Sequence, residues 1–225
     1  MNWLSKTLSS SLGKKLIMSI TGLFLILFLV IHLAGNLALL KNDNGLAFNA
    51  YAVFMTSNPL IKVVSYGLYL SILLHALYGL LLTLINRRAR PVAYAVVRGV
   101  DNSTWASRNM MILGTFIFAF IALHLKDFWW HYKFSGYEFS IDAEGNRDLY
   151  ALVVQQLKVP FSMVSYLIGL AALGAHLSHG FQSAFQTLGL EHSKYTPLIK
   201  QLGVFYSIAV PLGFAIMPLY VYFIL

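Results

Sequence analysis

Long apolar stretches alternate with short polar ones along the whole chain. Five of these stretches reach the length of about 20 residues that a helix needs to cross the hydrocarbon core of a bilayer. They cover residues 15–40, 60–85, 109–130, 159–185 and 202–225. The last contains Pro211 and Pro218, which membrane helices tolerate as kinks. The pattern predicts an all-α integral membrane bundle of five transmembrane helices, and residues 1–225 show no break that asks for a second domain.

Two shorter patterns lie outside these stretches. Apolar residues recur at helical spacing between Trp3 and Leu12, which is typical of a helix lying on the membrane surface, although a frayed terminus fits as well. Asp148 precedes a second amphipathic pattern over residues 149–157. An aspartate in that position predicts the N-cap of a short helix.

Composition supports a membrane protein and narrows the chemistry. Hydrophobic residues make up 58% of the chain and charged residues only 11%, whereas soluble domains carry about 25% charged residues. The chain has no cysteine, which excludes disulfides, thiolate zinc sites and cysteine-ligated iron–sulfur clusters. A redox centre in this chain would therefore use histidine or methionine ligands.

In a membrane protein, the net charge of +8 indicates which way the chain crosses the membrane and not a nucleic-acid partner. With the N-terminus inside, the inner regions hold ten of the sixteen basic residues but only Asp101 and Glu191 of the eight acids. The ten are Lys6, Lys14, Lys15, Arg87, Arg88, Arg90, Arg98, Arg108, Lys194 and Lys200. The other acids, Asp127 among them, are assigned to outer loops. We therefore predict a cytoplasmic N-terminus and an outside C-terminus. The basic inner loop 86–108 suits a partner subunit, although topology alone explains its charge.

Four histidines are distributed one per span over the first four spans: His32, His75, His124 and His176. Ionisable side chains inside a membrane are costly and usually mark a function. Neutral imidazole is a good ligand of haem iron. A single buried histidine could be a hydrogen bond between helices, but four of them on four helices favour haem ligation.

Depth in the membrane indicates how the four histidines pair. With a rise of 1.5 Å per residue, His32 and His124 fall in the outer half, while His176 falls in the inner half and His75 slightly inside the middle. The predicted axial pairs are His32 with His124 and His75 with His176. Because both axial positions of each iron are then filled by protein, such centres carry electrons and do not bind oxygen.

Other polar residues near these positions are candidates for contacts with haem propionates or quinone. Ser19, Trp105 and Arg108 lie where they could bind the propionates of the inner haem, but Trp105 could equally be an interface anchor and Arg108 a topology charge. His179 follows His176 by three residues and could meet a propionate, a quinone or water. A zinc site at these two histidines is disfavoured because no third ligand stands nearby.

Four segments of the chain together resemble the diheme cytochrome b subunit of succinate dehydrogenases and fumarate reductases. The segment SITGLF from Ser19, continuing to His32, resembles the first helix of that family. HALYG from His75 and HLSHG from His176 resemble its second and fourth helices, and His124 stands where the third-helix ligand is expected. The likeness runs from about residue 19 to residue 189; only the four motifs in order, with five spans, make it specific.

The resemblance implies a membrane anchor for a flavoprotein subunit and an iron–sulfur subunit on the cytoplasmic face of a bacterial inner membrane. In that family two haem b groups carry electrons between a dicarboxylate and menaquinone or ubiquinone, and the helices pair as the depth argument has them. Nothing in this chain looks like a dicarboxylate site. We expect the quinone near the outer haem, in the region of Asn36 and Asn49.

One position departs from some members of the family. Some diheme fumarate reductases carry a glutamate, implicated in moving protons, two residues before the fourth-helix ligand, where this chain has Gly174. We expect this protein to lack that proton route.

Two other functions compete with this interpretation. The first is the diheme cytochrome b of a hydrogenase, formate dehydrogenase or nitrate reductase. The second is a transporter with a histidine proton relay. The absence of acids within the spans and of an inverted repeat speaks against a transporter.

Overall fold

The computed structural model describes residues 2–89 and 103–225 and confirms the all-α class. The described residues form no β-strand, only an isolated β-bridge between Ile141 and Arg147. Most of the basic inner loop, including Arg90, Arg98 and Asp101, lies outside the described residues.

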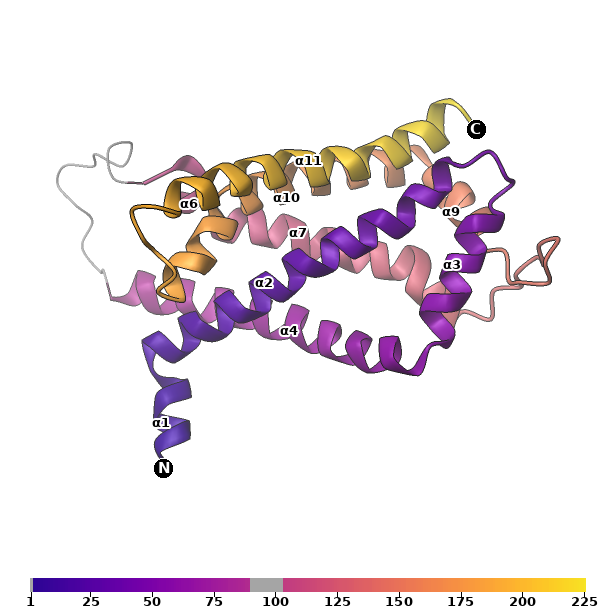
Figure 1. Cartoon of the computed structure of the whole chain (residues 1–225). Coiled ribbons are helices and arrows are strands. Elements are labelled where there is room, and N and C mark those ends of the chain that lie inside the picture. Colours follow the sequence, from indigo (N-terminus) through magenta and orange to yellow (C-terminus); the bar gives the residue numbers. More distant parts are fainter. Residues whose placement is uncertain (1, 90–102) are drawn as a thin grey trace.

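Five helices are long and apolar enough to cross a membrane, as the hydrophobic pattern predicts (Figure 1). They are α2 (Ser11–Asn36) with its 3-10 extension η1 (Leu37–Leu40), α4 (Pro59–Arg88), α7 (Met110–His124) with its extensions η2 (Leu125–Trp130) and α8 (His131–Lys133), α10 (Pro160–Thr187) and α11 (Thr196–Phe223). The first extension of α7, η2, is a π-helix. Prolines stand in the first turn of α4, α10 and α11, where the missing amide hydrogen costs nothing.

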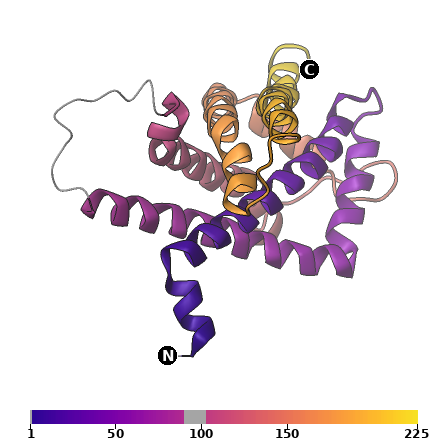
Figure 2. The same ribbon diagram turned by 60° about the vertical axis from the view of Figure 1, so that its left-hand side comes forward.

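Among the described residues, four shorter helices lie at the ends of the bundle: α1 (Trp3–Ser9), α3 (Leu46–Ser57), α6 (Trp105–Arg108) and α9 (Leu149–Leu157). The predicted cap of α9 is confirmed, because the Asp148 side chain accepts a hydrogen bond of 3.0 Å from the Ala151 amide. The sequence analysis did not predict α3, which lies across one end of the bundle in both views (Figures 1 and 2).

α2, α4, α7 and α10 form a closed ring, in that order, in which each helix packs against two neighbours. α11 lies outside the ring, against α10 and α2. Within the described helices, the diagonal pairs, α2 with α7 and α4 with α10, show no comparable packing. The space between the diagonals is therefore filled by side chains and not by close contact between backbones.

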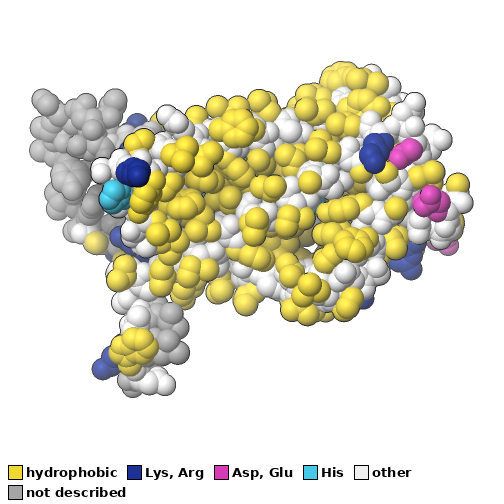
Figure 3. Space-filling view, viewed as in Figure 1, with side chains coloured by type: hydrophobic (Ala, Val, Ile, Leu, Met, Phe, Trp, Pro, Cys, Tyr) yellow, Lys and Arg dark blue, Asp and Glu magenta, His cyan; other side chains and the backbone are white. Residues whose placement is uncertain are grey.

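The two termini lie at opposite ends of the bundle (Figure 1). We refer to the end where α2 begins and α6 lies as the inner end, and to the end with α3 and α9 as the outer end. Yellow apolar side chains cover the flank of the bundle, and charged side chains gather at its two ends (Figure 3). This distribution suits a bilayer around the flank. Which end faces the cytoplasm stays a prediction.

The main hydrophobic core lies at the outer end. Its buried residues come from η1, α3, α9, α10 and α11: Leu39, Phe48, Val153, Leu157, Tyr166, Met217 and Val221. Leu152, on α9, is also completely buried. The short helices α3 and α9 thus close the outer end of the bundle and fix the ends of the long helices there.

α10 and α11 lie close together at Gly174. A Cβ atom at this position would lie 3.0 Å from the backbone carbonyl oxygen of Ser207 and 3.6 Å from the Pro211 ring. Small residues at such contacts let membrane helices pack backbone to backbone. A glutamate at position 174 would have to push α11 away, so the contact gives a physical reason for glycine here.

Replacing Gly174 by leucine is expected to force α10 and α11 apart and to destabilise the protein. Overpacking of this kind costs about 1–3 kcal/mol, which lowers the midpoint of thermal unfolding by several degrees. The matched control is Gly114→Leu on α7, because no described atom lies within 4 Å of a Cβ added there. Equal unfolding midpoints for the two variants in detergent would contradict the close packing of α10 on α11.

Candidate functional site

The structure brings the four span histidines together as two pairs inside the four-helix ring. The ring centres of His32 on α2 and His124 on α7 lie 5.8 Å apart, with the ring planes at 87°. Those of His75 on α4 and His176 on α10 lie 6.2 Å apart, at 67°. Each pair spans one diagonal of the ring, so the imidazoles meet where the helix backbones do not.

The two pairs lie at different depths along the bundle. His75 lies against Gly22 on α2, ten residues before His32. On α10, Tyr166 lies against His124 and comes ten residues before His176. Since ten helical residues rise about 15 Å, both helices separate the pairs by about 15 Å. The outer pair is His32 with His124, and the inner pair is His75 with His176.

The spacing within each pair fits a metal between two imidazoles. Metal–imidazole bonds of about 2 Å on each side put the two ring centres about 6 Å apart. Among the described residues, no group of three or more histidine, cysteine, aspartate or glutamate side chains could hold a metal ion. A haem iron takes two imidazoles from the protein and its other ligands from the macrocycle.

The surroundings of His75 favour the tautomer that a haem ligand needs. Its Nδ1 atom lies 3.2 Å from the Thr21 hydroxyl oxygen. That hydroxyl donates its hydrogen to the Ile17 carbonyl at 2.7 Å, so it is left to accept from Nδ1–H. With the proton on Nδ1, the lone pair is on Nε2, where it can bind a metal.

Gly22 makes room for the His75 ring. A Cβ atom at Gly22 would lie 3.2 Å from the His75 Cε1 atom, which is closer than most such contacts. The glycine of the SITGLF segment is thus explained by the imidazole packed against it. The inner histidine and the first-helix segment depend on each other.

His32 and His176 have different polar contacts. Asn36 places its side-chain nitrogen 3.3 Å from His32 Nδ1 and 2.8 Å from the His32 carbonyl oxygen. The buried Nδ1 atom of His176 has no hydrogen-bond partner among the described residues. An unpaired polar atom in a buried place is costly, and a metal bound at Nε2 would leave this Nδ1 atom unpaired.

His124 has a polar neighbour that the sequence analysis misplaced. Asp127 was assigned to an outer loop and the spans were taken to hold no acids, but this residue lies in η2 within the third membrane-spanning segment. Its exposed fraction is 4%. Tyr166 stands between it and His124, and the sequence analysis did not single out this tyrosine. In the sequence, the position of Asp127 three residues after a histidine of the span was the signal that could have identified it.

The predicted propionate contacts surround the inner half of the bundle. Ser19 is buried one turn before Gly22, and its hydroxyl donates to the Lys15 carbonyl at 3.1 Å. Trp105 is 60% exposed at the start of α6. Arg108 is exposed and its guanidinium binds the Ser103 carbonyl and hydroxyl. His179 is half-buried on α10. Contacts of these four residues with haem stay predictions.

Asn49 has a structural role at the outer end. It is completely buried, and its side-chain nitrogen donates to Asp142 at 3.1 Å and to Asp148 at 3.0 Å. Its side-chain oxygen accepts from the Tyr150 amide at 2.9 Å. These hydrogen bonds tie α3 to α9 and the preceding loop, and a contact of Asn49 with quinone stays a prediction.

The same network acts on Asp142. Desolvation disfavours the charged form of its carboxyl group, but hydrogen bonds from the backbone amides of Asn146 and Glu144 and from the Asn49 side chain outweigh it. Together they hold the pKa of Asp142 below its usual value. The carboxylate is therefore a fixed acceptor for the outer loop at neutral pH.

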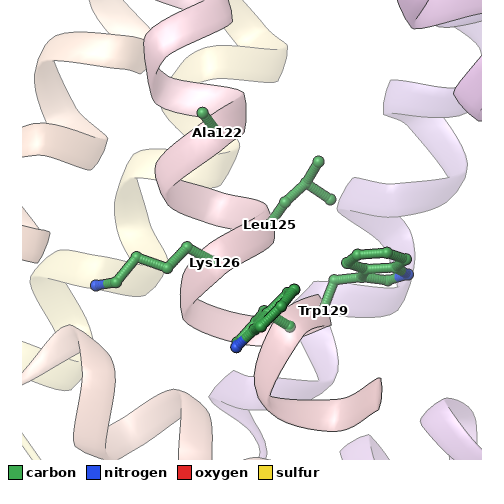
Figure 4. Close-up of a pocket in the computed structure, with 5 residues that line it drawn as sticks. Ala122, Leu125, Lys126 and Trp129 are labelled. Carbon is green, nitrogen blue, oxygen red and sulfur yellow. The ribbon is translucent and has the colours of Figure 1, made fainter. Parts of the chain in front are cut away.

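Two hollows lie beside the outer end of α7. The first, of about 320 Å³, is lined by Ala122, Leu125, Lys126, Trp129 and Trp130 (Figure 4). Leu125 and Trp129 point to one side of the helix and Lys126 to the other (Figure 4). The second, of about 160 Å³, is lined by Leu123, Lys126, Asp127, Gln156, Val159, Phe161, Ser162, Ser165 and Tyr166. Lys126 thus lines both an aromatic hollow and a second one that Asp127 and Tyr166 also line.

Comparisons with protein-family models, with characterised proteins and with solved structures find no match to this chain.

Alanine variants of the four histidines test the pairing. His32→Ala and His124→Ala are each expected to lose the same one of two haem signals, because each removes one axial ligand of a shared iron. His75→Ala and His176→Ala are expected to lose the other. Haem per polypeptide, which should fall by about half in each case, and the reduced-minus-oxidised spectrum provide the measurement. His192→Ala, in the exposed link between α10 and α11, should keep both signals. If His32→Ala and His75→Ala lost the same haem signal, the pairing would be contradicted.

Proposed function

We propose that this protein is the diheme cytochrome b membrane subunit of a succinate:quinone oxidoreductase. The observation that carries the proposal is the pair of imidazole contacts at 5.8 and 6.2 Å on the two diagonals of one helical ring. Two centres about 15 Å apart cover much of a hydrocarbon core about 30 Å thick. This arrangement suits a chain that passes electrons from one membrane face towards the other.

In this function the protein holds and orients the two haem groups and shields them from water. Four helices each contribute one imidazole, and contacts such as Thr21 with His75 fix the tautomer that leaves Nε2 free. The apolar flank keeps water from the centres. Haem b bound at each pair would supply reversible one-electron chemistry with no open axial position. Quinone, the electron partner within the membrane, is expected at the outer end.

The choice of a succinate:quinone oxidoreductase over other diheme complexes is supported by the order of the four motifs along the chain. In this proposal, a flavoprotein subunit and an iron–sulfur subunit dock on the inner end, which faces the cytoplasm of a bacterium. Basic residues of the described inner end, such as Lys14, Arg87 and Lys194, suit that contact. The dicarboxylate is bound by the flavoprotein and not by this chain.

Gly174 gives this proposal one specific corollary. The close contact of α10 with α11 leaves no room for a long acidic side chain beside His176. A proton route through a glutamate at this position is therefore not expected, and proton uptake during quinol oxidation should not compensate transmembrane charge movement. Fully compensated charge movement in proteoliposomes would contradict this corollary.

Purification of the tagged chain from its native membrane is the direct test. We expect a covalent or tightly bound flavin and iron–sulfur clusters to copurify, together with succinate-dependent reduction of quinone. Copurification with a hydrogenase, formate dehydrogenase or nitrate reductase would keep the diheme cytochrome but overturn the choice of enzyme. A protein that contains no haem would overturn both and favour a histidine relay in a transporter.

A further inference from the structure

A buried carboxylate stands behind the outer histidine pair. Asp127 is 4% exposed, and its Oδ1 atom lies 3.5 Å from the ammonium group of Lys126, whose side chain is 68% exposed. Charged groups inside a membrane protein are costly unless they are paired, and they usually mark a function. Lys126 provides the charge that pairs with the Asp127 carboxylate.

Tyr166 connects this carboxylate to His124. Its hydroxyl lies 3.3 Å from Asp127 Oδ2 and 3.4 Å from His124 Nδ1. A carboxylate can only accept, so the hydroxyl donates its hydrogen to Asp127 and its oxygen accepts from His124 Nδ1–H. The order of donors thus runs from imidazole to tyrosine to carboxylate. It leaves the lone pair of His124 on Nε2.

Packing holds the tyrosine between its two partners. Tyr166 is 7% exposed, and its ring contacts those of Phe120, at 5.1 Å between centres, and Phe128, at 6.1 Å. Both hydrogen bonds are longer than is usual for a hydroxyl group. The surrounding rings therefore define the position of the tyrosine, and the hydrogen bonds select the tautomer of the histidine.

The inner pair has no such carboxylate among the described residues that contact it. His75 has the neutral Thr21 hydroxyl at Nδ1, and His176 Nδ1 has no partner in the described chain. A negative charge reached through a hydrogen bond makes an imidazole a stronger donor to a metal. A stronger donor stabilises the oxidised iron relative to the reduced iron.

We infer that Asp127 and Tyr166 are positioning residues for His124 that hold its imidazole as a metal ligand and lower the reduction potential of the outer haem. This inference rests on the proposed diheme function. The two residues act as one unit: Tyr166 transmits the effect, and Asp127 supplies the charge.

The test is a potentiometric titration of the full-length protein with both haems bound. Asp127→Asn keeps an oxygen that can accept from Tyr166 but removes the charge, and Tyr166→Phe keeps the ring but removes the connection. Each should make the outer haem easier to reduce, with a threefold to tenfold larger ratio of reduced to oxidised haem at a fixed potential; tenfold corresponds to about 59 mV for one electron. The inner haem should not shift, and His75→Ala identifies which signal is the inner one.

Controls separate a positioning role from a structural or a long-range one. Glu138→Gln removes another outer-end acid that is exposed in the loop after α8, and should leave both potentials unchanged. The double variant of Asp127 and Tyr166 should shift the outer haem no further than Tyr166→Phe alone, because the effects share one route. The low-spin electron paramagnetic resonance signal of the outer haem should change in Tyr166→Phe.

Three outcomes would overturn the inference. They are unchanged outer potentials in fully haem-loaded variants, equal shifts of both haems, and additive shifts in the double variant. If Asp127→Asn does not accumulate, Tyr166→Phe still decides, since it changes a single hydroxyl group. A wild-type protein without haem would instead overturn the proposed function, so the two failures are distinguishable.

Discussion

The constraint on which this structure depends is the burial of four imidazoles in an apolar helical bundle. A polar ring in such a place needs a partner for each nitrogen, or it costs free energy. The helices place the imidazoles in pairs on the diagonals of a ring, with His32 beside His124 and His75 beside His176. Other features serve the same arrangement: Gly22 makes room for His75, and Thr21 takes the hydrogen of its Nδ1 atom.

The two ends of the bundle differ in how they support the pairs. At the outer end, α3, α9 and the buried Asn49 network fix the loops, and the polar side chains Tyr166 and Asp127 stand behind His124. At the inner end the described contacts are fewer and the surface is basic. A rigid outer end and a basic inner surface suit a membrane anchor that binds a partner at one face. The same asymmetry places the second, polar hollow next to the outer histidines.

Hydrophobic length was sufficient to predict the five long helices, and an aspartate before an amphipathic stretch predicted the cap at Asp148, because both signals are local in the sequence. α3 was missed because a 12-residue apolar helix is too short to span a membrane and its neighbours read as loop. Asp127 was misplaced because only three-dimensional packing in the π-helix shows that it is buried. For the same reason the sequence did not show the structural role of Asn49, whose hydrogen bonds join segments about a hundred residues apart. The approach of the histidines in pairs agrees with the depth argument, while their ligation of haem is still to be measured.

That measurement is the haem content and spectrum of the purified wild-type chain. The account predicts two low-spin haem b groups per polypeptide, with no spectral change on adding a small ligand such as carbon monoxide to the reduced protein, because both axial positions are occupied by histidine. Two distinct low-spin ferric signals should appear in the oxidised protein. A protein that folds in detergent and binds no haem, or one whose reduced haems bind carbon monoxide readily, would contradict the central claim that four imidazoles hold two haems in this bundle.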